Sequence, residues 1–187
     1  MGALELADRL DRLVRWIGER AAWLMVALMA VTIFDVVTRR FFVLGSTLLQ
    51  ELEWHLHTMN FCLALGFAYL ADAHVRIDLV RERLGPRARA WIESLGCLLF
   101  FVPFSLVVLV VSLQFVEISW AQGERSSSGL GLPFRWAIKA FIPISMVLLL
   151  LASLAVLARN LLFLFGPAEV RARLADLHRP ARQPVGT

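Results

Sequence analysis

The residues best suited to chemistry lie in one stretch, QELEWHLHTMNFCLALGFAYLADAHVRID, at positions 50–78. Histidines beside carboxylates are typical ligands of zinc, and histidine also binds haem iron. Two histidines, His55 and His57, lie near the start of the stretch and a third, His74, lies near its end. Residues 54–71, which include His55 and His57, contain no Asp, Glu, Lys or Arg, and a helix of that length extends ~27 Å. The two groups of histidines therefore cannot share one small ligand.

Other catalytic or metal-binding patterns are missing from the sequence. It has no H-E-x-x-H, G-x-S-x-G, P-loop or paired-cysteine motif, which zinc proteases, serine hydrolases, ATPases and zinc sites require. Cys62 and Cys97 lie in apolar runs without a ligand partner nearby, so we expect them to be packing residues. The sequence predicts no enzyme, no catalytic or substrate-binding residue, no metal site and no cofactor.

The composition is that of a membrane protein. Hydrophobic residues make up 59% of the chain, charged residues 18%, and the mean hydropathy is +0.70. A soluble domain of this length would bury less apolar surface, so we expect a lipid bilayer to solvate much of the chain. The pI near 10.0 would suggest nucleic acid in a soluble protein. In a membrane protein it indicates basic loops, and no nucleic acid partner is expected.

The pattern of apolar runs predicts an all-α integral membrane protein with four transmembrane helices. Before them, apolar residues recur at helical spacing and predict an amphipathic helix in the membrane interface. Pro103 lies inside the third span and predicts a kink or a locally broken hydrogen bond. The predicted segments are the interfacial helix 1–20, the spans 21–41, 48–71, 91–120 and 134–165, a basic cytoplasmic connection 72–90, a periplasmic loop 121–133 and a basic cytoplasmic tail 166–187. The apolar positions of the interfacial helix are Leu6, Leu10, Leu13, Ile17 and Ala21.

The basic residues predict how these spans are oriented. Of the 19 Lys and Arg residues, 14 lie in the amino-terminal arm, in the connection after the second span, or from Arg159 onward. Basic residues favour the cytoplasmic side of a membrane. We therefore expect both termini in the cytoplasm, in a bacterial inner membrane crossed several times by the chain.

Two polar groups mark the outward ends of the first two spans. Asp35 lies about one turn inside the first span, with Arg39 four residues later. This spacing predicts an ordinary ion pair, and the alternative is a contact with a partner subunit. Glu51 with His55 and Glu53 with His57 have the same spacing in the second span and are either solvated or part of a docking surface. The candidate interface comprises Asp35, Arg39, Glu51, Glu53, Trp54 and His55, with Trp54 also suited to anchor the helix at the membrane surface.

A second polar cluster follows the second span, on the predicted cytoplasmic side. Asp72, His74, Arg76 and Asp78 alternate with apolar residues. This pattern is typical of a capped helix end, and the alternative is a site for an anion. We expect a structural or interface role.

Together these residues carry a resemblance to a transporter family. The series Asp35-Val-Val-Thr-Arg39, Gln50-Glu51-Leu52 and HVRID, followed by Gly131-Leu132-Pro133 and Ile142-Pro143, resembles the small membrane subunit of tripartite ATP-independent periplasmic (TRAP) transporters. The resemblance covers about residues 20 to 165 and marks Gly131 and Pro133 as periplasmic loop positions.

The resemblance also implies what the chain does and with what. It implies a large multi-span partner subunit that carries substrate and sodium, and a periplasmic solute-binding protein that delivers an organic anion or a related small solute. The chain itself would be a non-catalytic scaffold in ion-coupled uptake. The alternative function is that of a small four-span membrane enzyme or redox subunit that uses the histidine and acid clusters.

Overall fold

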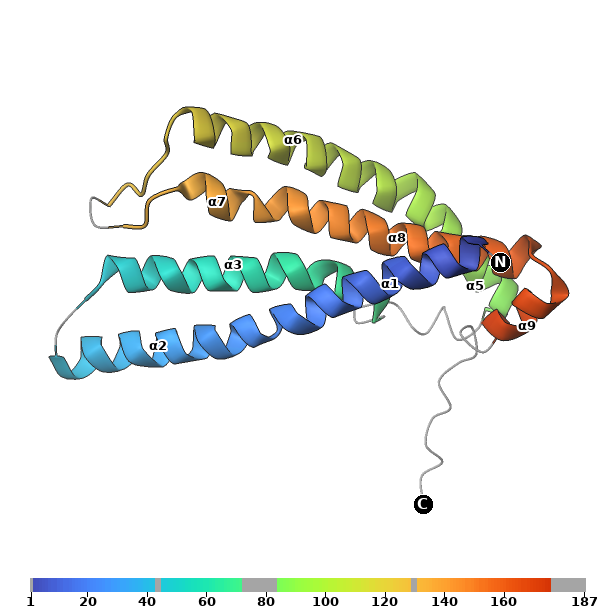
Figure 1. Ribbon diagram of the computed structural model, residues 1–187, viewed down its shortest axis with the longest axis horizontal. Helices are drawn as coiled ribbons and strands as arrows, with labels where there is room; N and C mark the ends of the chain where they lie inside the picture. Colours follow the sequence, from blue (N-terminus) through green and yellow to red (C-terminus); the bar gives the residue numbers. More distant parts are fainter. Residues whose placement is uncertain (1, 43–44, 72–83, 129–130, 176–187) are drawn as a thin grey trace, which may run out of the picture.

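The computed structural model describes residues 2–42, 45–71, 84–128 and 131–175, and all regular structure within them is helical (Figure 1). The helices lie roughly along one axis, so the molecule is an elongated bundle. Their bounds are α1 Gly2–Ala21, α2 Trp23–Phe42, α3 Thr47–Leu70, α5 Pro86–Gly96, the π-helical segment η1 Cys97–Phe101, α6 Val102–Ala121, α7 Arg135–Lys139, α8 Phe141–Phe165 and α9 Ala168–Ala175.

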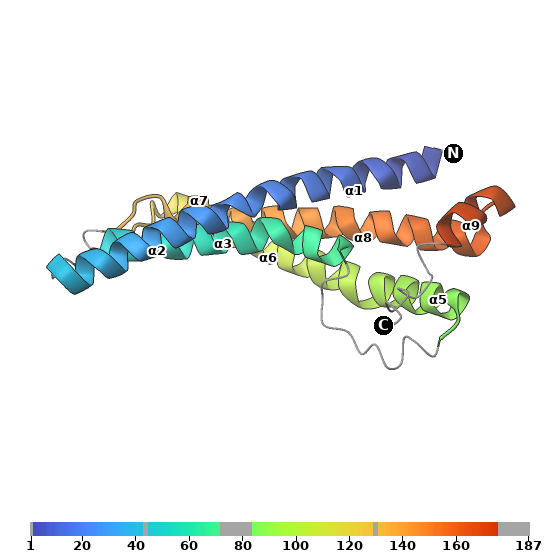
Figure 2. The same cartoon turned by 90° about the horizontal axis from the view of Figure 1, so that it is seen from below.

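Helices α1 and α2 are separated only by Ala22 and run nearly in one line (Figure 2). Together, as Gly2–Phe42, they contain 41 residues, which corresponds to ~61 Å of helix, about twice the thickness of the hydrocarbon core of a bilayer. The apolar half is α2. The predicted interfacial helix 1–20 corresponds to α1. Helix α1 continues the line of α2 and packs against α3 and α8.

The face of α1 that packs on the bundle is shifted by one residue from the apolar stripe seen in the sequence. Leu6 and Leu13 of that stripe are exposed. The buried face consists mostly of small residues, which allow helices to approach closely where there is little hydrophobic driving force. These buried residues are Ala7, Asp11, Val14, Gly18 and Ala21.

Three of the described helical segments are long and apolar enough to span a membrane: Gly2–Phe42, Pro86–Ala121 and Arg135–Phe165. Helix α3, the predicted second span, is less apolar because it contains glutamate, histidine and asparagine. It packs against α1, α2 and α8, and most of its residues are at least half-buried. Neighbouring helices thus shelter much of its polar surface from lipid.

Helix α8 supplies most of the core. Nine of its residues are buried, including the fully buried Ala152 and Ala155. At its contact with α3, a Cβ on Gly66 would lie 3.0 Å from the Leu148 carbonyl oxygen and 3.0 Å from Cγ1 of Val14. Three helices therefore meet at Gly66, where the missing side chain allows the backbones to come close.

Helices α5 and α6 form one long segment interrupted by a π-helical turn. The turn ends just before Pro103, which has no N–H to donate, so the predicted disturbance at this proline is present. Helix α6 packs on α8 and buries a serine at every seventh position, with hydroxyls of two of them donating to its own backbone. These serines are Ser105, Ser112 and Ser119.

The bundle has two distinct ends. We call "turn end" the one with Ser46 and the connection between α6 and α7, and "terminal end" the one where α1 and α5 begin and α9 lies (Figures 1 and 2). Described basic residues at the turn end are Arg39, Arg40, Arg125, Arg135 and Lys139; those at the terminal end include Arg9, Arg12, Arg15, Arg87, Arg89, Arg159, Arg171 and Arg173.

Candidate functional site

The Glu51 carboxylate binds the connection between α6 and α7. Ser126 donates its hydroxyl to Oε1, and the Leu132 amide donates to Oε2 at 2.6 Å. Arg135 lies 3.8 Å from Oε1, and only 14% of the Glu51 side chain is exposed. We call this arrangement the Glu51 latch. Glu51 was a candidate for partner contact, and the structure gives its carboxylate donors within the same chain.

Gly131 makes the latch possible. A Cβ at this position would lie 2.2 Å from Oγ of Ser126 and 2.6 Å from Oε1 of Glu51. Any side chain would therefore push the loop away from α3. Pro133 follows on the exposed side of the loop and precedes Phe134, which has a positive φ of 62°. Sequence reasoning singled out Gly131 and Pro133 but missed Ser126 and Arg135, because no local signal links them to a helix so far away in the chain.

The other predicted pairs of α3 behave differently from one another. His55 Nδ1 donates to the backbone carbonyl of Glu51 at 2.6 Å, so the ring binds the helix backbone and not the carboxylate. His57 is exposed, and Oε1 of Glu53 is buried without a hydrogen-bond partner among the described residues. Trp54 is 70% exposed, which suits a residue that faces lipid or a partner.

Asp35 forms the predicted ion pair with Arg39, through Oδ2. The Asp35 side chain is only 3% exposed, and its second oxygen, Oδ1, is buried without a hydrogen-bond partner in the described part of the chain. Asp35 and Glu53, each with one carboxylate oxygen that has no partner in the described part of the chain, line one open groove of about 420 Å³ between α2 and α3. We call it the α2–α3 groove; its lining residues are Thr32, Asp35, Val36, Arg39, Arg40 and Glu53.

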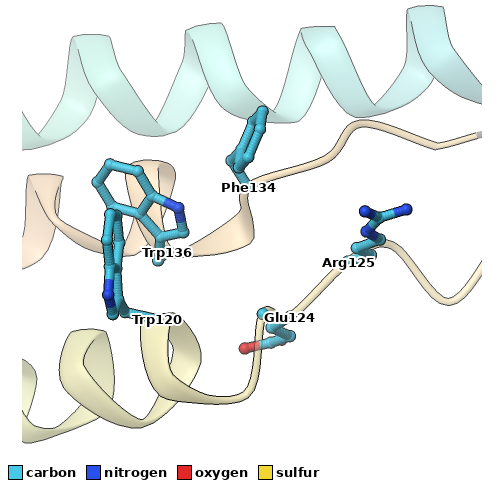
Figure 3. A pocket seen from close by; sticks show the side chains of 6 residues that line it. Trp120, Glu124, Arg125, Phe134 and Trp136 are labelled. Atoms are coloured by element: carbon cyan, nitrogen blue, oxygen red, sulfur yellow. The ribbon is translucent and has the colours of Figure 1, made fainter.

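A second cavity, of about 250 Å³, lies beside the latch at the turn end (Figure 3). Trp120 and Trp136 meet edge to face with ring centroids 4.5 Å apart. Lys139 donates a hydrogen bond to the Glu124 carboxylate and forms an ion pair with it, and this contact lowers the pKa of Glu124 below its ordinary value. The pair ties the loop to α7. The lining residues are Trp120, Gly123, Glu124, Arg125, Phe134 and Trp136.

A polar cluster at the terminal end fastens α1 to the bundle. Arg159 of α8 donates to Asp8 at 2.9 Å and to Asp11 at 3.0 Å. Arg15 donates to Asp11 at 2.8 Å and to the Leu70 carbonyl at 3.0 Å. Sequence reasoning did not foresee this cluster, although the charges inside apolar or amphipathic helices were a signal that they need partners.

The described residues contain no group of three or more His, Cys, Asp or Glu side chains arranged to hold a metal ion. Cys62 and Cys97 are free and buried, and Cys97 contacts the Ser153 carbonyl at 3.7 Å. The predicted cytoplasmic motif of Asp72, His74, Arg76 and Asp78 lies outside the described residues.

Comparison with known families adds one match. The model of a family described as "Tripartite ATP-independent periplasmic transporters, DctQ component" matches residues 28–163. This segment runs from within α2 to within α8 and includes the α2–α3 groove and the Glu51 latch. No curated protein and no solved structure matches the chain.

Proposed function

Because this chain belongs to the DctQ family, the small membrane components of tripartite ATP-independent periplasmic transporters, we propose that it is a non-catalytic scaffold for the large membrane subunit. The observation that carries the proposal is the family match over 28–163, which covers most of the helices. The large subunit would carry the substrate and the coupling ion. A periplasmic solute-binding protein would deliver the substrate, an organic anion or a related small solute.

The internal contacts of the chain support a scaffold role. Charged residues inside a transport protein usually mark the path of an ion or substrate. Here the charges at the two ends are largely used to hold the chain together: Glu51 binds the α6–α7 connection, and Arg159 binds α1. A bundle with these internal contacts and a wide exposed apolar surface suits a brace better than a carrier.

The proposed orientation places both termini in the cytoplasm and counts α3, the second span along the chain, in addition to the three long apolar segments. The separation of the basic residues into a rich terminal end and a poor turn end supports it, because basic residues favour the cytoplasmic side. Cysteines introduced at Ser127 and at Arg87, both exposed, should react with a membrane-impermeant reagent from opposite sides of the inner membrane. Reaction of both from one side would contradict the orientation.

Uptake by reconstituted vesicles tests the function itself. We expect sodium-dependent uptake when this chain, its large subunit and its binding protein are present together. Omission of this chain should abolish uptake, and the chain alone should move no solute. Full uptake by the large subunit and binding protein without this chain would refute the scaffold role.

A further inference from the structure

We infer that the α2–α3 groove receives a cationic side chain, an arginine or lysine, from the large membrane subunit. This inference rests on the proposed function and adds to it the place and the chemistry of one contact. It also changes the candidate interface: the Glu51 carboxylate has donors within the chain, whereas Asp35 and Glu53 each keep one buried oxygen without a donor among the described residues.

Each of the two acids in the groove has one carboxylate oxygen without a hydrogen-bond donor in the described part of the chain. Oδ1 of Asp35 and Oε1 of Glu53 are buried and have no hydrogen-bond partner among the described residues. A buried charged group without a donor is costly, and more so beside hydrocarbon than beside water. Two such oxygens, on two residues of different helices that line one groove, indicate that a partner packed on the groove supplies their donors.

The two arginines that line the groove do not donate hydrogen bonds to these oxygens. Arg39 is ion-paired with Oδ2 of Asp35 and leaves Oδ1 without a donor. Arg40 is exposed and makes no hydrogen bond or ion pair with another described residue. A guanidinium or ammonium group that enters from outside would supply several N–H donors at once.

The α2–α3 groove is accessible to a partner from outside the chain. Helices α2 and α3 diverge toward the turn end (Figure 1), and Asp35 is the only buried residue of α2. Val36, at the rim of the groove, is 57% exposed, and its apolar neighbours Ile33 and Phe34 are also exposed. A helix of the large subunit can thus pack on the apolar rim and place a long side chain in the groove.

A phosphate group fits the groove less well than a basic side chain. It would bring a further negative charge next to Asp35 and Glu53, and Arg39 is already paired with Asp35. Like charges at close range repel each other, most strongly where water is scarce. A basic side chain instead brings N–H donors for the two oxygens that Arg39 and Arg40 leave without a partner.

Glu53 gives the cleaner test, because its variants break no ion pair within the described chain. The complete small subunit is co-expressed with a tagged large subunit, and the retained fraction is measured after detergent extraction. Glu53→Gln should reduce retention by about threefold to twentyfold, the range that one interhelical polar contact implies, and Glu53→Lys should reduce it further. The matched controls are Glu117→Gln and Glu117→Lys, at an exposed acid of α6, and both should retain the large subunit fully. All variants should be as abundant in the membrane as the unaltered chain.

A second measurement locates the contact independently of charge. A photo-crosslinking amino acid placed at Val36 should capture the large subunit. The same amino acid at Val111, which is equally exposed at 57% on α6, should give a much weaker product. Unchanged retention with both Glu53 variants, or capture at Val36 of phospholipid alone, would overturn the inference and leave the scaffold role intact. Failure of the unaltered chain to retain the large subunit would instead refute the proposed function.

Discussion

The substitution Gly18→Ala should separate α1 from α3. A Cβ on Gly18 would lie 2.2 Å from Cβ of Phe67 and 2.7 Å from its Cγ. Both Cβ atoms are fixed to their backbones, so no side-chain rotation relieves the overlap. The two helices would have to move apart by about 1.2 Å to restore an ordinary contact of 3.4 Å. That movement would also lengthen the hydrogen bond from Arg15 to the Leu70 carbonyl.

The size of the effect follows from comparison with Gly96→Ala. Gly96 is also helical, but a Cβ there meets nothing within 4 Å. Both substitutions contribute the same ~0.5–1 kcal/mol by which alanine favours a helix over glycine. Their difference therefore isolates the steric cost, which is about 1–3 kcal/mol for overpacking. For a chain of this size, each kcal/mol corresponds to roughly 2–4 °C in the midpoint of thermal unfolding.

The assay is thermal unfolding of the purified variants in one detergent, followed by near-ultraviolet circular dichroism. We expect Gly96→Ala to unfold at or above the temperature of the unaltered chain, and Gly18→Ala to unfold several degrees below it. A disulfide trap between cysteines on α1 and α3 should also form more slowly in Gly18→Ala. Equal midpoints for the two variants would show that α1 does not pack on α3 through Gly18.

Three further predictions concern the two ends of the bundle. Gly131→Ala should open the Glu51 latch and speed hydrogen exchange of the Ser128 and Leu132 amides; unchanged protection would exclude the latch. The hydrogen bond from Lys139 lowers the pKa of Glu124. The pair therefore stabilises the folded chain above the ordinary glutamate pKa, and this stabilisation is lost as the pH falls through the lowered pKa. Tryptophan fluorescence should follow this loss in the unaltered chain but stay flat in Glu124→Gln. Arg159→Met removes two hydrogen bonds to carboxylates and should destabilise the chain by about 2 kcal/mol, with faster proteolysis inside α1 as the readout; a variant as resistant as the parent would contradict the fastening of α1.

Several features of this protein could be read from the sequence because they depend on composition or on residues near each other in the chain. The excess of apolar residues identifies a membrane protein, and the apolar runs predict its helices. The i, i+4 spacing predicts the ion pair of Asp35 and Arg39. Pro103 predicts the disturbed helix that precedes it. In each case the physical cause lies within about one helical turn, or in a sum over the whole chain.

Other features depend on which helices are neighbours, and only the tertiary structure decided them. Periodicity shows that α1 has an apolar stripe, but close approach at Gly18 and Gly66 selects the adjacent face of small residues for packing. The partners of Glu51 lie 75 and 81 residues later in the chain, and Arg159 reaches Asp11 across 148 residues. Glu51 and Glu53 look alike in the sequence, yet they point to different sides of α3. One meets the α6–α7 connection, and the other lines the α2–α3 groove with one oxygen left without a donor among the described residues, because helix packing, and not residue type, determines which polar groups meet.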